Sequence, residues 1–180
     1  VGQAANTYYV YEQLYDERGK PIEGLYRDIN GDGEISADDL RPYKKAAPDW
    51  TLGLNTKLRW KRLDLTVSGH GNFGTYNYNA VAASGSALSA TSVYVSETLV
   101  NRLRCAFDTG FQIPQPYSDY FIQNASFFRI DSVVLGWTFD SLFKSRANGR
   151  VYLNVQNPLV MTSYTGLDPE VFGGHDGTLY

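Results

Sequence analysis

The stretch that decides the fold runs from Trp50 to Phe73 and reads WTLGLNTKLRWKRLDLTVSGHGNF. Apolar and polar residues alternate through two segments of equal length, 50–60 and 63–73, and only Lys61 and Arg62 lie between them. A period of two residues is typical of β-strands, because successive side chains point to opposite faces of a sheet. The sequence therefore predicts an antiparallel hairpin with a two-residue turn.

One face of the predicted hairpin is apolar, with Thr56 as the one interruption in its first segment. In the first segment this face carries Trp50, Leu52, Leu54, Leu58 and Trp60, and in the second it carries Leu63, Leu65, Val67, Gly69, Gly71 and Phe73. A tilted strand of about 9–11 residues crosses a bilayer, and aromatic side chains flank the apolar band of membrane barrels. A soluble β-sandwich alternates in the same way, so the period alone leaves both architectures open.

The composition favours an all-β protein. The 180 residues include 14 Tyr, 9 Phe, 3 Trp and 17 Gly, and these residue types are typical of strands and turns. A net charge of −3 without a basic run argues against nucleic acid as a partner. The single cysteine, Cys105, excludes an internal disulfide. No apolar run reaches the length of a membrane helix. No signal peptide is recognised, so we expect a mature chain or a piece of a longer one.

The first 49 residues are predicted to form a long excursion before the hairpin. Tyr8 to Tyr15 is expected to pair with Ile22 to Tyr26, because the residues between them are rich in turn formers. Ser36 is a candidate helix N-cap, and the helix is expected to run for about two turns, to Lys44 and Lys45.

The sharpest local motif in this region has the spacing of a calcium loop. Its predicted ligands, at alternate positions and at the twelfth, are Asp28, Asn30, Asp32, Glu34 through its carbonyl, Ser36 through water, and Asp39. Calcium prefers six to eight oxygen ligands, and Gly33 stands where such loops turn sharply. Asp39 stands where a Glu usually binds through two oxygens, and its side chain is one methylene shorter. The alternative is a surface turn rich in Asp, Asn and Gly that binds no metal.

Residues 74–126 lose the strand period and are predicted to form a very long connection. It includes a helical stretch from about Ser92 to Phe107 and an aromatic segment with Tyr117 and Tyr120. These two tyrosines are candidate contacts for a sugar or peptide, although aromatic residues that pack the loop against itself would give the same pattern. A connection of this length counts against a compact sandwich, whereas long loops on one side are typical of outer-membrane barrels.

Two further strands are predicted after this connection. In Phe127–Phe139, Val133 and Trp137 lie on one face, and Phe128 and Ile130 lie on the other. Arg129 and Asp131 fall on the same face as Val133 and Trp137, so we expect the face that carries Val133 and Trp137 to become polar toward the start of the strand. The second strand follows from Val151, Leu153 and Val155, and Asn157-Pro158 is expected to end it or to introduce a bulge. Short and long connections thus alternate along the chain, which favours a barrel.

Several motifs together resemble the SusC/RagA family of TonB-dependent outer-membrane transporters. They are Pro48-Asp49-Trp50, Gln123 to Asp131 (QNASFFRID), Val155-Gln156-Asn157-Pro158 and Tyr164 to Val171 (YTGLDPEV). The acidic loop from Asp28 to Asp39 also resembles one in that family. The resemblance covers nearly the whole chain.

The resemblance implies an all-β fold in which this chain supplies the C-terminal strands of a plugged transmembrane β-barrel of about 22 strands with long extracellular loops. The implied organisation is an extracellular loop at 1–49 with the calcium-type motif, a hairpin at 50–73, a long extracellular loop at 74–126, a strand pair at 127–160 and an extracellular loop at 161–180. The plug domain and the final strand are expected to lie outside this chain. The turn at Lys61-Arg62 would then be periplasmic.

The implied function is TonB-dependent import of glycans or peptides across the bacterial outer membrane, together with a SusD-like surface lipoprotein. TonB would act through a region outside this chain, and outer-membrane lipid would surround the strands. His70 on the polar face is a further candidate substrate contact. No catalytic residue is expected, because His70 and His175 are solitary and no Ser-His-Asp set is evident. The alternative is a soluble, secreted β-rich binding module with a calcium-stabilised loop.

Overall fold

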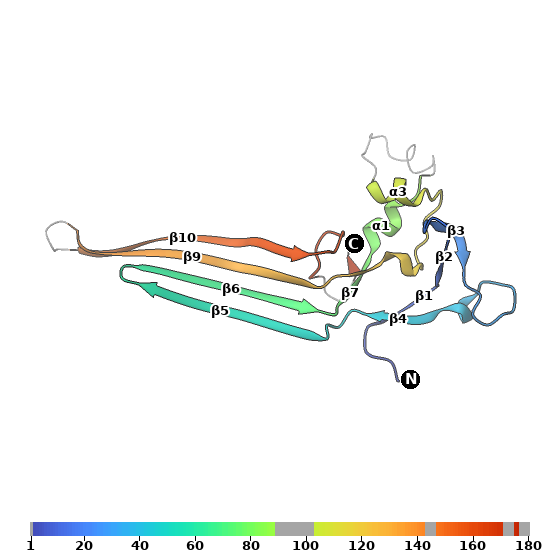
Figure 1. Ribbon diagram of the computed structural model, residues 1–180, viewed down its shortest axis with the longest axis horizontal. Coiled ribbons are helices and arrows are strands. Elements are labelled where there is room, and N and C mark those ends of the chain that lie inside the picture. Colours follow the sequence, from blue (N-terminus) through green and yellow to red (C-terminus); the bar gives the residue numbers. More distant parts are fainter. Residues whose placement is uncertain (1, 89–102, 143–146, 171–174, 177–180) are drawn as a thin grey trace. The chain divides into compact units, whose positions relative to one another are not determined.

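A computed structural model describes residues 2–88, 103–142, 147–170 and 175–176 (Figure 1). The chain divides into two compact units, which we call the sheet unit and the loop unit. The sheet unit comprises Pro48–Gly74 and Ser126–Ser163, and the loop unit comprises Val1–Ala47, Thr75–Ala125 and Tyr164–Tyr180. Each unit is described by itself below.

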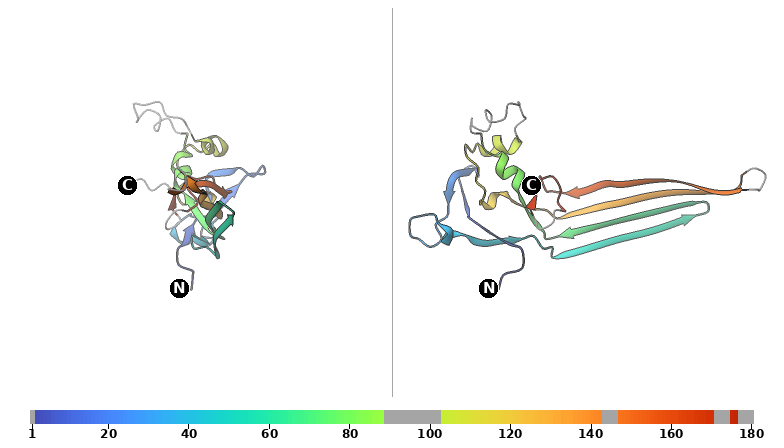
Figure 2. Two further views of the ribbon diagram at one scale, coloured as in Figure 1. Left: turned by 90° about the vertical axis from the view of Figure 1, so that its left-hand side faces the viewer. Right: turned by 180° about the vertical axis from the view of Figure 1, so that it is seen from behind.

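The sheet unit is a single antiparallel sheet of four long strands in the order β10-β9-β6-β5. The strands are β5 (Trp50–Trp60), β6 (Leu63–Phe73), β9 (Phe127–Leu142) and β10 (Ala147–Thr162). Figure 1 shows them side by side, and the rear view in Figure 2 shows the same order. The predicted hairpin and the two later strands are therefore confirmed.

The hairpin has the register that its sequence predicts. Trp50 pairs with Phe73 and Trp60 with Leu63, so only two residues form the turn. Lys61 takes a φ of 54° there, in the left-handed region that tight hairpin turns require. Because no residue is inserted along β5 or β6, the apolar positions of the two strands stay opposite one another.

The pairing of β6 with β9 corrects the predicted faces of β9. Ser68 pairs with Ser132 but Gly69 pairs with Ile130, so Asp131 is an extra residue at a β-bulge. A bulge shifts the side-chain alternation by one position. Phe128, which pairs with Gly71, therefore joins the apolar face, and the prediction that this face becomes polar toward the start of the strand was wrong.

A second irregularity in β10 lies at the same level of the sheet. Gln156 pairs with Ser132 and Leu159 with Ile130, so Asn157 and Pro158 lie opposite the single residue Asp131. Asn157 has a φ of 48°. The bulge predicted at Asn157-Pro158 is confirmed, and the strand continues beyond it to Thr162.

The loop unit is built from short elements. Its strands are β1 (Thr7–Val10), β2 (Gln13–Tyr15), β3 (Pro21–Tyr26), β4 (Arg41–Lys45), β7 (Tyr76–Asn79), β8 (Ile122–Asn124) and β11 (His175–Asp176). The helices in its described residues are α1 (Ala80–Gly85), α3 (Arg104–Thr109) and the 3₁₀ turns Ala37–Asp39 and Asp119–Phe121. The described strands form the small sheets β1-β4, β2-β3 and β11-β7-β8.

Two predictions for the first 49 residues need correction. Only Gln13–Tyr15 pairs with Pro21–Tyr26, whereas Thr7–Val10 pairs with β4. The helix predicted from Ser36 to Lys45 is a three-residue 3₁₀ turn followed by β4. Ser36 is the N-cap as predicted, but Pro42 has no N–H to continue a helix, and β1 supplies a partner strand.

Aromatic and small residues form the core of the loop unit. Phe121 and Phe111 are almost fully buried and pack with Ala82 and Ala83 of α1. Most of the helical stretch predicted from Ser92 to Phe107 lies outside the described residues. Among the helices that are described, none is long and apolar enough to cross a membrane.

Candidate functional site

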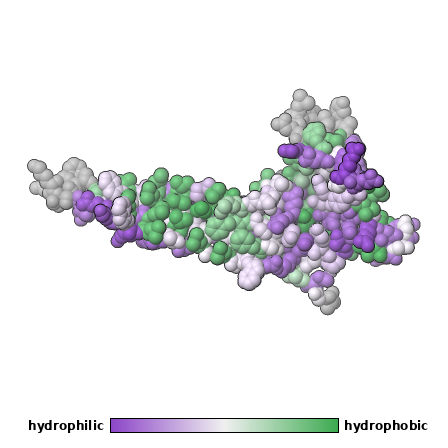
Figure 3. Space-filling model, in the orientation of Figure 1, coloured by the Kyte–Doolittle hydropathy of each residue, from purple (hydrophilic) through white to green (hydrophobic). Residues whose placement is uncertain are grey.

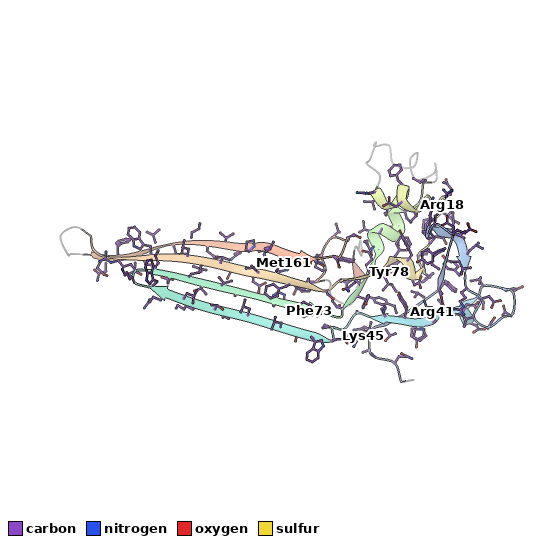
Figure 4. The ribbon with its side chains drawn as sticks, viewed as in Figure 1. Arg18, Arg41, Lys45, Phe73, Tyr78 and Met161 are labelled. Carbon is purple, nitrogen blue, oxygen red and sulfur yellow. The ribbon has the colours of Figure 1, made fainter. Side chains whose placement is uncertain are left out.

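The apolar face of the sheet unit is exposed rather than packed. Trp50 is 77% exposed, Leu58 58% and Trp60 68%. Figure 3 shows hydrophobic residues along the strands of this unit, and Figure 4 labels Phe73 and Met161 toward the end opposite the turn. An apolar surface of this extent marks contact with a membrane or another protein.

The distance between the two tryptophans fits a membrane. Trp50 and Trp60 stand at the two ends of β5 on the same face. At about 3.3 Å per residue the strand spans roughly 33 Å between them. A tilt of roughly 40° reduces this to about 25 Å, which is the height of the apolar band of outer-membrane barrels.

An ion pair crosses the opposite, polar face near the turn. Arg150 of β10 donates to Asp64 of β6, from Nε to Oδ1 at 3.1 Å and from Nη2 to Oδ2 at 2.5 Å. Gly136 of β9 lies between them, since a Cβ there would stand 2.4 Å from Arg150 Nη2 and 2.6 Å from Asp64 Oδ1. This crossing explains why glycine occupies position 136.

His70 lies on the same polar face, at the level of the bulge. Its Nδ1 is 2.9 Å from Asp131 Oδ2, and its ring packs edge-on against Phe127. Ser68 and Ser132 share a hydrogen bond of 2.8 Å beside this pair. His70 is thus held by contacts with β9 of the same sheet. The bulge that places Asp131 beside it could not be predicted from the alternation of polar and apolar residues in β9.

In the predicted calcium loop, Asp28, Asn30 and Asp32 gather in one exposed turn. Asp28 accepts from the N–H groups of Gly31 at 2.6 Å and Gly33 at 2.8 Å. Asn30 Nδ2 donates to Asp32 Oδ2 at 2.8 Å. Glu34 is close by, since its N–H donates to Asp32 Oδ1. Carboxylate and amide oxygens are the donors that calcium prefers, so this part of the loop fits the ion chemically.

Asp39, predicted as the twelfth ligand, ties the loop to itself. It is fully buried and accepts from the N–H groups of Ile29 at 2.8 Å, Ser36 at 2.9 Å and Asn30 at 3.4 Å. These hydrogen bonds, that of Ser36 foremost, lower the pKa of the carboxyl. Across the part of the chain that the structure describes, no cluster of three or more His, Cys, Asp or Glu side chains could hold a metal.

The two candidate tyrosines lie in different settings within the loop unit. Tyr117 is 62% exposed and packs edge-on against Tyr11 at 6.5 Å. Tyr120 is half-buried against Phe121. Burial, followed by the charges of Asp108 and Cys105, raises the pKa of Tyr120. His70 belongs to the sheet unit, whereas both tyrosines belong to the loop unit.

Tyr120 lines an open cavity of about 660 Å³ within the loop unit. The remaining lining residues are Asn79, Val81, Ala82, Leu103, Arg104, Cys105, Asp108, Phe121, Gln123, Thr165, Gly166 and Leu167. One wall is fixed by Gln123 Oε1, which accepts from Thr165 Oγ1 at 2.7 Å. Sequence reasoning missed this cavity, because its walls come from segments far apart along the chain.

A polar network that the sequence did not reveal fixes the tyrosine segment. Asp119 accepts from Gln13 N at 3.1 Å and from Arg41 Nη2 at 2.8 Å. Ser118 is fully buried and donates to Gln13 Oε1 at 2.7 Å. Figure 4 labels Arg41, the cation of this network. The network joins the first strands to residues about a hundred positions later and orients the segment that carries Tyr117 and Tyr120.

Comparison with known proteins identifies the family. No family model matches the sequence. The TonB-dependent receptor SusC of Bacteroides thetaiotaomicron is 40% identical over 185 residues, which cover 100% of this chain and 18% of that protein. The sequence belongs with the SusC/RagA TonB-dependent receptors. The TonB-dependent receptor P3 of Formosa agariphila is 25% identical over 94% of this chain and 19% of its own length.

Solved structures of a peptide importer share the fold of this chain. The RagAB peptide importer in its 'closed-closed' state aligns with a TM-score of 0.64 at 22% identity, over 94% of this chain and 21% of that one. Its 'open-open' state aligns with a TM-score of 0.65 at 20% identity. The chain thus spans about a fifth of the length of the receptors that it matches.

Membership in the SusC/RagA receptors decides two sequence-based predictions. TonB-dependent receptors reside in the bacterial outer membrane, which confirms the predicted location. Receptors of this family are transporters rather than enzymes, in agreement with the prediction that the chain does not belong to an enzyme. The apolar face of the sheet unit is the surface such a location requires, because a strand in a bilayer must present apolar side chains to lipid.

Proposed function

We propose that this chain forms part of the wall and outer loops of a transporter that imports nutrients across the bacterial outer membrane in a TonB-dependent manner. The observation that carries the proposal is the similarity to SusC along the whole chain. The exposed apolar face between Trp50 and Trp60 supports it independently. In this proposal the chain contributes C-terminal strands to a barrel of about 22 strands. The Lys61-Arg62 turn is periplasmic, and the loop unit is extracellular.

The proposed partners are a SusD-like surface lipoprotein and TonB, the latter through a region outside this chain. The proposed cargo is a glycan or a peptide. A related fold serves in the RagAB peptide importer, and the chain's own tyrosines can stack on either class of cargo. Tyr117 and Tyr120 are proposed contacts in the loop unit, and His70 is a proposed contact on the polar face of the wall.

The test is to purify the full-length receptor that contains this chain from its native outer membrane. We expect it to extract only with detergent, to carry a surface lipoprotein, and to release a bound glycan or peptide that mass spectrometry identifies. A receptor that partitions into buffer would contradict the membrane placement and favour the soluble binding module. A receptor that stays in the membrane but carries no lipoprotein would contradict the proposed partner.

We also propose that the acidic loop binds calcium through Asp28, Asn30, Asp32, the Glu34 carbonyl and Ser36, with Asp39 bracing the loop. The close approach of Asn30 and Asp32 supports this. Calcium titration by calorimetry tests it, and Asp28→Asn with Asp32→Asn should abolish the heat of binding.

Asp16 offers a matched control for the calcium experiment. Its Oδ1 accepts from Arg18 N and Lys20 N in a similar exposed turn that lacks the motif. Asp16→Asn should leave calcium binding unchanged. Equal losses in the two sets of variants, or no binding by the unmodified receptor at millimolar calcium, would contradict the calcium proposal.

A further inference from the structure

The turn end of the sheet unit combines exposed aromatic side chains with cations. Trp60 pairs with Leu63, and Leu63 pairs with Trp137, so the three lie in one row across the apolar face. Trp60 is 68% exposed and Trp137 52%. Trp137 also packs edge-on against Phe139 at 5.9 Å, which widens the aromatic surface. Amphipathic aromatic rings of this kind sit at the head-group level of a membrane.

The two turn residues place positive charge directly beyond this row. Lys61 Nζ lies 5.3 Å from the centre of the Trp60 ring. Arg62 approaches Asp140 at 3.8 Å, but both side chains are 60% exposed, and such exposed pairs are weak. The Arg62 carbonyl accepts from Thr138 N at 2.8 Å, so the backbone of the turn is fixed while its charges remain accessible. In Figure 3 hydrophilic residues gather at this end of the strands.

The open end of the same hairpin differs in charge. Trp50 and Phe73 are register partners there, but the adjacent residue is Asp49, whose N–H donates to the Phe73 carbonyl at 2.8 Å. An aromatic side chain thus stands at each end of the hairpin, whereas the residues that adjoin it are Lys61 and Arg62 at the turn and the acidic Asp49 at the open end. This asymmetry points to an anionic ligand at the turn end.

We propose that Lys61 and Arg62 bind the phosphate of an anionic glycerophospholipid whose acyl chains lie against Trp60 and Trp137. The inference rests on the proposed membrane placement of the sheet. Each basic residue beside an anionic leaflet strengthens attraction to it. The lipid is favoured over a soluble anion, because the apolar row that its acyl chains would cover is continuous with the cations.

The chain supplies a matched control on the same strand. Lys57 and Arg59 carry the same two charges, but they occupy the alternate positions of β5, which face the polar side together with Asp64. Removing them changes the net charge equally without touching the proposed lipid site. A merely electrostatic effect of total charge would therefore appear in both variants.

The experiment measures lipid retention by the full-length receptor in native mass spectrometry. The probes are phosphatidylglycerol and phosphatidylcholine with identical acyl chains. The unmodified receptor should retain phosphatidylglycerol in preference. Lys61→Asn with Arg62→Gln should weaken this binding about twenty-five-fold, at roughly fivefold per basic residue. Asn is chosen because it tolerates the left-handed backbone of position 61. Lys57→Gln with Arg59→Gln should leave binding unchanged.

Equal retention of the two lipids by the unmodified receptor would overturn the inference, as would equal losses in the two double variants. Preferential retention of lipopolysaccharide, used as a third probe, would overturn the assignment to a glycerophospholipid. If the double variant fails to fold, Arg62→Gln alone should still weaken binding about fivefold. A receptor that inserts into bilayers without lipid preference refutes only this inference, whereas one that stays in buffer refutes the proposed function.

Discussion

The two units place their large apolar residues in opposite ways. In the loop unit Phe111 and Phe121 are 1% and 0% exposed, whereas in the sheet unit Trp50 and Leu58 are 77% and 58% exposed. The loop unit follows the rule for proteins in water, where apolar side chains are buried. In the sheet unit the side chains of the apolar face are exposed instead, as expected of a surface that lipid covers in the proposed barrel. By this proposal one chain is built for two solvents.

The units also differ in how they satisfy polar groups. The long strands of the sheet unit pair their backbone in continuous ladders. The loop unit relies more on side chains, as when the buried Gln13 donates to the carbonyls of Leu14, Ile22 and Leu25. Ladders need no particular side chain, but such networks do. A single substitution in the loop unit should therefore disturb its own hydrogen-bonding neighbours. In the sheet unit, the effect of a substitution should depend on which face of the sheet carries the residue.

The largest expected effect tests the buried core of the loop unit. Phe121→Ala should cost about 3–5 kcal/mol, because it leaves a cavity in a packed core. Hydrogen exchange followed by mass spectrometry should show faster exchange in peptides from 104–125 and no change in β9. Tyr117→Ala, at an exposed position, is the control. Faster exchange in both units would show that they do not fold independently.

The next effect tests which face of the sheet meets lipid. Leu54→Arg, near the middle of the apolar face, should cost about 2–4 kcal/mol in the bilayer. Asn55→Arg, one residue later on the polar face, should change the free energy of unfolding by less than about 0.5 kcal/mol. Urea unfolding of the receptor in lipid vesicles measures both. Equal costs would contradict the two-solvent comparison.

A smaller effect tests the polar face. Gly136→Val should cost about 1–3 kcal/mol by overpacking, because its Cβ would meet the ion pair between Asp64 and Arg150. Gly53→Val is the control, since a Cβ at Gly53 meets nothing within 4 Å. Thermal unfolding in detergent should separate the two variants. Equal melting temperatures would show that the ion pair does not cross over position 136.

The smallest effect is a pH dependence confined to the loop unit. The pKa of Asp39 is lowered from its usual value of 3.8 by backbone hydrogen bonds. Its contribution to stability is therefore complete above that value and is lost as the pH falls through the lowered pKa. Acidification from pH 5 to 3 should destabilise the receptor more than it destabilises Asp39→Asn. Melting temperatures of both at the two pH values measure this, and identical losses would contradict it.

Local sequence was sufficient to predict the hairpin and the strands that follow it. The alternation between Trp50 and Phe73 is uninterrupted, and the register of an antiparallel hairpin follows from its turn. The alternation in β9 was misleading, because a bulge at Asp131 forms only when β9 is paired with β6. Asp131 is identified as the extra residue only by the register between β9 and β6, because nothing in the sequence of β9 alone marks it.

The loop unit was less predictable for the same reason. Pro42 was the available signal against a helix from Ser36 to Lys45, but the strand that replaces it needs Thr7–Val10 as a partner. The cavity beside Tyr120 is likewise assembled from distant segments. The predicted calcium ligands are close together in the sequence, and in the structure Asp28, Asn30 and Asp32 lie in one turn. Calcium binding itself stays a prediction.

The sequence by itself determined the amphipathic hairpin, its two-residue turn, the tryptophans at its ends and the resemblance to SusC/RagA receptors, because all of these are properties of neighbouring residues. Only the tertiary structure decided which residues of β9 lie on the apolar face, why glycine stands at position 136, and how Asp119 joins distant strands. Those features depend on contacts between strands, and such contacts are made by residues far apart in the chain.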